Sequence, residues 1–235
     1  MPIKSHRPEP RTVSRWTRRG FVGAGVSLPL LAGCSSDENS ASSDVLKMMG
    51  QTIDAYTGSD SITRDQAAAV PYASIGVSVG DSGQALLVLA AQFGTTCLWA
   101  SAAHIAIETQ FGRITHTAGL AHNMSQDSFS GGDPLQSGVR SADGAYEFAI
   151  DLPDRNIYQA SVRYEMGPAR AGEIVVLGAK LNVLHVRESG FCSLLDWRFE
   201  NEYWADATNG FIWQSQQAIH PSLDQVTIVA LRPPA

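Results

Sequence analysis

Apolar residues recur at two different spacings along this chain, and the change of spacing separates a short helical part from a long part made of strands. From residue 72 onward they recur at every second position, which is typical of strands with one buried face. Glycine, aspartate and asparagine separate these segments, and no helical pattern lies between them. The sequence therefore predicts an antiparallel sheet of about ten strands, within Ala73–Val79, Ala85–Ala91, Thr95–Ala100, His104–Gln110, Ile114–Thr117, Tyr146–Leu152, Tyr158–Tyr164, Glu173–Val186, Trp197–Ala205, Gly210–Ala218 and Gln225–Leu231.

A sheet with so many strands does not stay flat, because each strand twists relative to its neighbour. We expect it to curl into a barrel or a half-barrel, with a sandwich as a third arrangement. Residues 121–142 are polar and rich in glycine, and they form the longest loop that the sequence predicts. The expected fold class is mainly β, in a single domain over residues 44–235 that begins with a short helix.

Two short helices are expected before the strands. Residues 44–57 carry apolar side chains at three- and four-residue spacing, with Asp44 able to cap the start and Gly58 ending the segment. A second helical turn, from Arg64 to Ala69, stops before Pro71, because a proline disfavours helical backbone in the residue before it. The apolar residues of the first helix are Val45, Met48, Met49, Ile53 and Tyr56, and we interpret Met48 and Met49 as core packing rather than as a ligand-binding surface.

The segment 197–218 is predicted to be a hairpin rich in aromatic residues. Its turn, Asp206 to Gly210, ends in Asn-Gly, a pair that accepts the positive φ of a tight turn. Period-two spacing puts Tyr203 on the apolar face of the first strand and Trp204 on the charged face. Two interpretations are open: the aromatic residues pack on the core, or Trp204, with Tyr203 and Trp213, forms a binding surface on which a sugar ring stacks.

The first 33 residues have the organisation of an export signal. Basic residues precede a short apolar run, residues 21–32, which at about a dozen residues is shorter than the roughly 20 that span a bilayer. Small residues then precede Cys34, which is typical of lipoprotein processing: the thiol is acylated and cleavage leaves this cysteine as the first residue. An ordinary secretory cleavage site is the alternative. Arg18 and Arg19 also fit the twin-arginine export signal, for which a plain basic segment is the alternative.

Processing at Cys34 changes the charge of the chain. Residues 1–33 hold six of the 17 basic residues and one of the 23 acidic residues, so their removal leaves a formal charge of −11. A surface of this charge repels phosphates and anionic lipid headgroups, which argues against nucleic-acid binding. We therefore expect the acyl chains on Cys34 to hold the protein at the membrane, with residues 34–43 as a flexible tether.

Two further cysteines, Cys97 and Cys192, follow Cys34. In an oxidising compartment they can form one disulfide, whereas the apolar strand around Cys97 fits a buried free thiol equally well. The sequence leaves both arrangements open.

The sequence indicates little chemistry of its own. His116 and His122 lie six residues apart with no neighbouring cysteine or carboxylate to complete a metal shell, so neither a metal site nor a cofactor is expected. His104 and His185 stand alone in strand-like segments. The acidic residues that could act in glycoside hydrolysis are Asp151, Asp154, Glu200, Glu202 and Asp206. Such a pair is defined by its separation in space, so the sequence assigns no catalytic residue.

Several short motifs occur in order between residues 44 and 235: Pro71-Tyr72-Ala73-Ser74-Ile75, Gly112-Arg113-Ile114, Thr117-Ala118-Gly119-Leu120, Asp133-Pro134-Leu135, Asn201-Glu202-Tyr203-Trp204-Ala205-Asp206, Gly210 to Trp213, and Leu231-Arg232-Pro233-Pro234. In these motifs the chain resembles the YjbF family of group 4 capsule and exopolysaccharide lipoproteins. The resemblance implies a lipid-anchored outer-membrane protein that faces the periplasm, carries a β-barrel-like domain and acts in polysaccharide production or export. The family offers no catalytic residues to carry over. Cys97 departs from its pattern, and the family does not need a twin-arginine leader.

Three functions are compatible with these features. The first is a non-enzymatic accessory lipoprotein that binds the sugar polymer or other secretion proteins, and the anchor, the strands and the resemblance favour it. The second is a lipid- or lipoprotein-handling protein, which requires a continuous apolar groove. The third is a polysaccharide-modifying enzyme, which requires two carboxylates that converge in a cleft.

Overall fold

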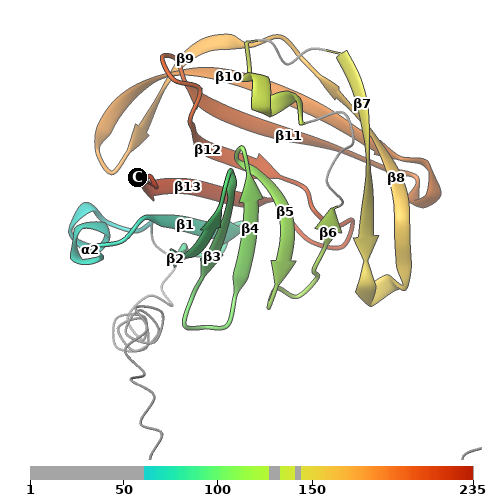
Figure 1. Cartoon of the computed structure of the whole chain (residues 1–235), viewed down its shortest axis with the longest axis horizontal. Coiled ribbons are helices and arrows are strands. Elements are labelled where there is room, and N and C mark those ends of the chain that lie inside the picture. Colours follow the sequence, from blue (N-terminus) through green and yellow to red (C-terminus); the bar gives the residue numbers. More distant parts are fainter. Residues whose placement is uncertain (1–60, 127–132, 141–143, 235) are drawn as a thin grey trace, which may run out of the picture. The chain divides into compact units, whose positions relative to one another are not determined.

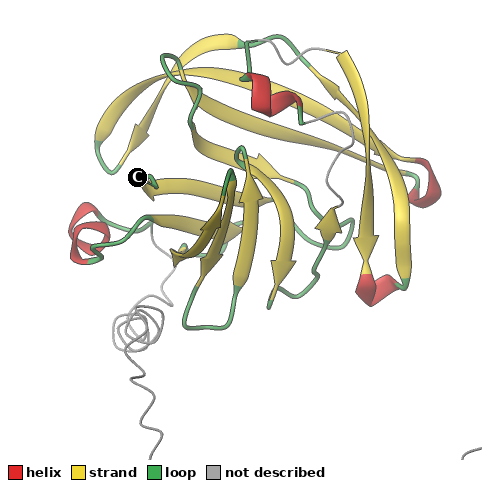
Figure 2. Cartoon of the chain, viewed as in Figure 1, coloured by secondary structure: helices red, strands yellow, loops and turns green. Residues whose placement is uncertain are grey.

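The computed structural model describes residues 61–126, 133–140 and 144–234. The export signal, Cys34, the tether and the predicted helix over residues 44–57 lie outside these ranges. The described part contains one short α-helix and thirteen strands, and loops and turns make up most of the remainder (Figure 2). The helix is α2 (Arg64–Ala69), and the strands are β1 (Ser74–Val79), β2 (Ala85–Phe93), β3 (Thr96–Ala100), β4 (Ala106–Gln110), β5 (Arg113–Ala118), β6 (Ser125–Gln126), β7 (Gly144–Leu152), β8 (Ile157–Met166), β9 (Arg170–Val176), β10 (Ala179–Cys192), β11 (Trp197–Asp206), β12 (Ile212–Gln217) and β13 (Val226–Arg232). Short 3₁₀ turns are η1 (Pro134–Ser137), η2 (Pro153–Arg155) and η3 (Ser193–Leu195).

The thirteen strands form one sheet that closes on itself (Figure 1). Neighbours follow chain order from β11 through β13 to β1 and on to β8, and the pairings are antiparallel. One edge of β10 pairs with β8 and with β9 over different parts of its length, while the other edge pairs with β11. The β10–β11 pairing closes a ring of twelve strands, and β9 extends it as an extra strand on β10. The predicted mainly β fold is confirmed, and the observed form is the closed barrel rather than the half-barrel.

Alternating side chains fill the barrel. Along β8 every second residue is buried, from Ala160 through Val162 and Tyr164 to Met166, and the intervening residues are exposed. Apolar side chains with almost no exposure reach the interior from around the ring: Leu87, Ile107, Ile114, Leu152, Val162 and Val226. Full burial of such a side chain contributes about 1.5–3 kcal/mol. The apolar half of the period-two pattern therefore supplies the force that holds the barrel together.

Helix α2 covers the outer face of β2. Thr63 and Gln66 form a capping box, in which each side chain accepts a hydrogen bond from the backbone amide of the other. Ala67 then packs with Leu86, whose side chain faces away from the barrel interior that Leu87 fills. The predicted helical turn is confirmed. Among the described residues no helix is long and apolar enough to cross a membrane.

Two predicted segments differ from the structure. The predicted strand Glu173–Val186 is divided into β9 and β10, because Leu177 and Gly178 form a two-residue turn with positive φ at both positions. Leucine is unusual at such a position, so the usual Asn-Gly signal is missing from the sequence. The predicted loop 121–142 contains β6 and η1. Although β6 is only two residues long, it pairs with both β5 and β7 and so completes the ring.

The connections between strands alternate between the two ends of the barrel, because antiparallel strands reverse direction at each connection. One end carries the β2–β3, β4–β5 and β11–β12 turns. The other end carries the β5–β6, β7–β8 and β12–β13 connections. Each end thus collects side chains from segments that are far apart in the sequence.

Candidate functional site

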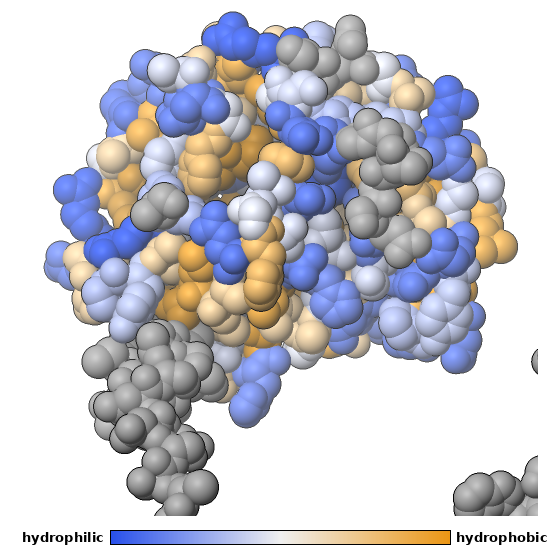
Figure 3. Space-filling view, viewed as in Figure 1, coloured by the Kyte–Doolittle hydropathy of each residue, from blue (hydrophilic) through white to orange (hydrophobic). Residues whose placement is uncertain are grey.

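A cleft of about 580 Å³ opens at the end of the barrel that carries the β4–β5 turn. Its rim consists of the β2–β3, β4–β5 and β11–β12 turns together with η1, and its floor is lined from β1, β3, β12 and β13. Figure 3 shows apolar surface inside a hollow on this face of the molecule. This volume lies within the range of roughly 300–1,000 Å³ that is usual for ligand sites.

The described residues that line the cleft include no aspartate, glutamate, histidine, lysine or arginine. They combine aromatic side chains with neutral hydrogen-bonding groups: Trp99, Phe111 and Phe211, with Gln92, Gln136, Asn209, Gln214, Thr95, Thr109, Ser137 and Ser215. The indole Nε1 of Trp99 donates to Thr109 Oγ1 at 2.9 Å, which fixes the ring in the floor. Such a lining can bind an uncharged ligand that has apolar faces and hydroxyl groups.

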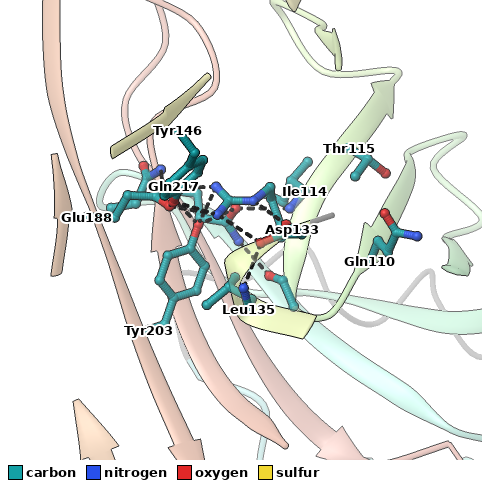
Figure 4. Close-up of polar contacts among 12 residues, drawn as sticks. Gln110, Ile114, Thr115, Asp133, Leu135, Tyr146, Glu188, Tyr203 and Gln217 are labelled. Carbon is teal, nitrogen blue, oxygen red and sulfur yellow. Dashed lines mark hydrogen bonds and ion pairs between the residues drawn. The ribbon is translucent and has the colours of Figure 1, made fainter. Parts of the chain in front are cut away.

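A buried network of charged side chains lies beside the cleft (Figure 4). Arg113, the first residue of β5, is 2% exposed and forms two ion pairs. Its Nε lies 2.6 Å from Asp133 Oδ2, and its Nη2 lies 2.6 Å from Glu188 Oε1. Its Nη1 also donates to Glu188 Oε2 at 2.9 Å, so the guanidinium holds Glu188 with two parallel bonds.

The remaining polar atoms of this network are also paired. Glu188 accepts a hydrogen bond from Asn201 Nδ2 at 2.7 Å and further bonds from the hydroxyls of Tyr146 and Tyr203. The rings around Arg113 lie with their centroids 5.1 to 5.8 Å from the guanidinium carbon: Tyr146, Phe148, Tyr164 and Tyr203. A buried ion pair is tolerated only when its hydrogen-bonding groups are satisfied in this way.

The same network includes Gln217, whose Oε1 accepts a hydrogen bond from the Tyr203 hydroxyl at 3.4 Å, and it fixes three segments of the cleft wall. Asp133 Oδ1 accepts a hydrogen bond from the backbone amide of Leu135 at 2.9 Å and so caps η1. The side-chain nitrogen of Gln217 donates to the Gly112 carbonyl and to Ser215 Oγ, each at 2.9 Å. Leu135, Gly112 and Ser215 all line the cleft. We therefore assign the network a positioning role, since its charges are buried while its hydrogen bonds reach the cleft.

The surroundings of Arg113 and of two neighbouring tyrosines shift the pKa values of these three groups. Burial by itself lowers the pKa of Arg113, but the charge of Glu188, followed by the influence of Tyr203 and the charge of Asp133, raises it well above its ordinary value. Burial raises the pKa of Tyr164 to about 12 and that of Tyr203 well above its ordinary value. The guanidinium therefore stays charged and these phenols stay protonated at neutral pH.

The predicted aromatic surface is partly wrong. Tyr203 is fully buried and belongs to the Arg113 network, because its position on β11 faces the barrel interior, so it cannot form a binding surface. Trp204 lies half-buried on the other face of β11 and stacks on His185, with ring centroids 4.8 Å apart. Trp213 is half-buried on β12 and donates from Nε1 to Asp206 Oδ2 at 3.1 Å. Sugar stacking on Trp204 stays a prediction.

Both described cysteines are free thiols, so the disulfide alternative is not the arrangement that the structure has. Cys97 is half-buried in β3 and lines the cleft, whereas Cys192 is fully buried at the end of β10. Burial raises the pKa of the Cys97 thiol, which is therefore protonated at neutral pH.

The structure also places the other residues that the sequence singled out. His116 and His104 are exposed, and His122 contacts Asp154 and His220 rather than His116. Among the acidic residues, Glu202 pairs with Arg187 and His185, Asp206 caps its own hairpin turn, and Asp151 accepts from the Gln159 amide. The structure therefore brings none of the named acidic residues into the described lining of the cleft.

Residues 50–231 match the group 4 capsule polysaccharide lipoprotein family GfcB, YjbF. The chain belongs to this family. The resemblance seen in the sequence motifs is thus confirmed over most of the chain. In this YjbF-family protein those motifs converge in space, since Arg113, Asp133, Asn201 and Tyr203 come from three of them and meet in one network. Comparison with curated proteins finds no match.

One solved structure supports the fold, and two others have lower similarity. The lipoprotein YmcC from Escherichia coli K12 is 18% identical, with a TM-score of 0.69 over 85% of this chain and 99% of its own. An exported protein with a YmcC-like fold from Bacteroides fragilis is 10% identical, with a TM-score of 0.35 over 68% of this chain and 93% of its own. A lipoprotein from Parabacteroides distasonis is 7% identical, with a TM-score of 0.33 over 68% of this chain and 92% of its own. The YmcC structure has the same fold as this chain.

Proposed function

We propose that this protein is a lipid-anchored accessory protein of capsule or exopolysaccharide production or export, and that it binds a neutral stretch of the polymer in the cleft without modifying it. The observation that carries the proposal is the lining of the cleft, which joins aromatic faces to amide and hydroxyl groups and includes no described charged residue. A sugar ring presents C–H faces to aromatic side chains and hydroxyl groups to neutral donors and acceptors. The family membership supplies the polymer as the ligand to test.

Binding without catalysis is supported by the position of the carboxylates. Most glycoside hydrolases use two carboxylates about 5–9.5 Å apart, on either side of the bond that they cleave. The two carboxylates of the network beside the cleft, Asp133 and Glu188, are buried and both held by Arg113. Neither is therefore positioned to donate or accept a proton for a bound sugar.

The lipid-handling alternative fits the cleft less well. An acyl chain offers no hydrogen bonds, so it would leave polar side chains such as those of Gln136, Ser137 and Gln214 without partners when it displaced their water. A sugar chain satisfies such groups. The polar part of the lining therefore favours a saccharide.

The location is part of the same proposal. Acylation of Cys34 anchors the protein in the outer membrane facing the periplasm, after export directed by Arg18 and Arg19. Ser35 follows Cys34 in place of the aspartate expected for retention in the inner membrane. Recovery of the protein in inner-membrane fractions would contradict this assignment.

The test is a clean deletion scored for secreted and surface polysaccharide, with complementation by four forms of the full chain. We expect rescue by the wild type and not by Cys34→Ala. Phe211→Ala removes an aromatic ring from the cleft rim and should reduce polymer, whereas Phe93→Ala, which removes an exposed ring from β2 that is not part of the lining, should rescue fully.

Each outcome has a meaning. Unchanged polymer in the deletion strain refutes the function. Equal rescue by Phe211→Ala and Phe93→Ala, at equal protein level, refutes the cleft as the binding site while leaving the accessory role in place.

A further inference from the structure

Three side chains converge at the end of the barrel opposite the cleft. His122 comes from the β5–β6 connection, Asp154 from η2 between β7 and β8, and His220 from the β12–β13 connection. His122 Nδ1 lies 2.6 Å from Asp154 Oδ2, and His220 Nε2 lies 3.4 Å from Asp154 Oδ1. The two imidazole rings stack with their centroids 4.5 Å apart and their planes 3° from parallel. One donor atom from each residue lies within 4.8 Å of the others.

His220 has an unusual environment within this cluster. Its side chain is 1% exposed, and its Nε2 is buried without a hydrogen-bond partner although it faces Asp154. A buried nitrogen in this state is unfavourable, and such groups in native proteins have an explanation, of which a bound ion is one.

We propose that His122, Asp154 and His220 form a binding site for a divalent transition-metal ion of the Zn²⁺ class. Two imidazoles and one carboxylate are ligands that Zn²⁺ accepts, and a water molecule would complete four-coordination. Bonds of about 2.0–2.1 Å in a tetrahedron place the ligand atoms about 3.3 Å apart. The widest separation among the three donor atoms must therefore fall from the 4.8 Å limit by at most about 1.5 Å, while His122 Nδ1 and Asp154 Oδ2 must move apart from 2.6 Å. The exposed Asp154 and half-buried His122 have room to move.

The hydrogen bond on the other side of His220 gives the proposal a specific signature. The backbone amide of Ser222 donates to His220 Nδ1 at 3.0 Å, so the neutral ring carries its proton on Nε2. A metal on Nε2 requires the proton to move to Nδ1, and two N–H groups would then face each other. Metal binding must therefore turn the Ser222 amide away from the ring.

The position in the barrel explains what the ion would contribute. His122 lies just before β6, the two-residue strand that joins β5 to β7. An ion held by His122, Asp154 and His220 would link three connections next to this shortest part of the ring. Binding should then raise the thermal stability of the protein, because the folded state binds the ion more tightly than the unfolded chain does.

The experiment is calorimetric titration of Zn²⁺ into the protein expressed from its full chain, purified in detergent without a histidine tag. We expect one ion per chain and a rise in the melting temperature. Asp154→Asn and His122→Asn should each weaken binding at least about tenfold, since loss of a supporting contact alone costs ten- to a hundredfold. Both residues lie at or near the surface, so these variants should fold. His116→Asn, an exposed histidine on β5, is the matched control and should bind like the wild type.

Two further measurements sharpen the result. Arg155, an exposed cation next to Asp154, opposes a positive ion, so Arg155→Gln should tighten binding. In amide NMR spectra, the Ser222 resonance should be among those that shift most on addition of Zn²⁺. If the wild type binds no more Zn²⁺ than Asp154→Asn does, or if His116→Asn is as impaired as His122→Asn, the proposal is overturned. Binding that leaves the Ser222 amide unchanged also overturns it.

Discussion

Replacement of Arg113 by methionine tests whether the buried network holds the cleft. Methionine keeps an unbranched apolar side chain at this position, but it ends short of the guanidinium and removes the cation between Asp133 and Glu188. Two buried carboxylates then lack the group that neutralises them. Removal of one partner from a buried ion pair costs about 3–5 kcal/mol. Since domains of this kind unfold with about 5–15 kcal/mol, we expect Arg113→Met to lose about a fifth or more of the total stability.

Urea unfolding followed by tryptophan fluorescence measures this loss. Glu188→Gln on the Arg113→Met background removes one of the two uncompensated charges and should recover part of the stability. Arg163→Met, which removes an exposed arginine from β8, is the matched control and should stay within about 0.5 kcal/mol of the wild type. A loss below about 1 kcal/mol for Arg113→Met would show that the carboxylates do not depend on this cation. A double variant no more stable than Arg113→Met would refute the charge argument.

Three other outcomes can be measured. Gly190→Ala places a methyl group 2.2 Å from the ring of its cross-strand neighbour and should cost about 1–3 kcal/mol. Gly172→Ala, whose added carbon has its nearest neighbour at 4.0 Å, should cost far less, and equal urea midpoints would contradict this. Hydrogen bonds, first from the Thr208 amide, lower the pKa of Asp206. The wild type should therefore melt at a higher temperature than Asp206→Asn, by a difference that is full above pH 3.8 and shrinks below it. An equal difference in melting temperature at pH 6 and pH 2.5 would exclude this. A maleimide should label Cys97 in the folded protein, and the labelling should become faster as the pH rises. The same reagent should label Cys192 only after unfolding, as measured by mass spectrometry. Labelling of Cys192 in the folded protein would contradict its burial.

Local sequence patterns predict most strands of the barrel. Period-two spacing predicts the strands because each strand has one buried face, and Asn209-Gly210 predicts the β11–β12 turn because it supplies the backbone that the turn needs. The sequence does not predict the turn at Leu177, because leucine rarely adopts a positive φ and no typical turn residue precedes Gly178.

The sites depend on contacts that no local pattern contains. Arg113 and Glu188 are 75 residues apart, and their pairing follows from how the closed ring places β5 opposite β10. Two residues of this network lie in family motifs, Gly112-Arg113-Ile114 and Asp133-Pro134-Leu135. Nothing in the sequence indicates that these two motifs contact each other in the folded protein. His220 had no such signal, because its partners His122 and Asp154 lie on two other connections.

The closure of the sheet limits how another protein can recognise this one. Where a strand of the closed ring is paired on both sides, both of its backbone edges are occupied, so a second chain cannot extend the sheet by adding a strand there. In the described sheet the strand at the end of the order is β9, which pairs with β10 on one side only. Its residues are mostly exposed, and Arg170 and Glu173 add charge that discourages unselective pairing. Recognition where the ring is paired on both sides has to use side chains and loop shape, whereas β9 offers an edge at which a partner can bind the backbone.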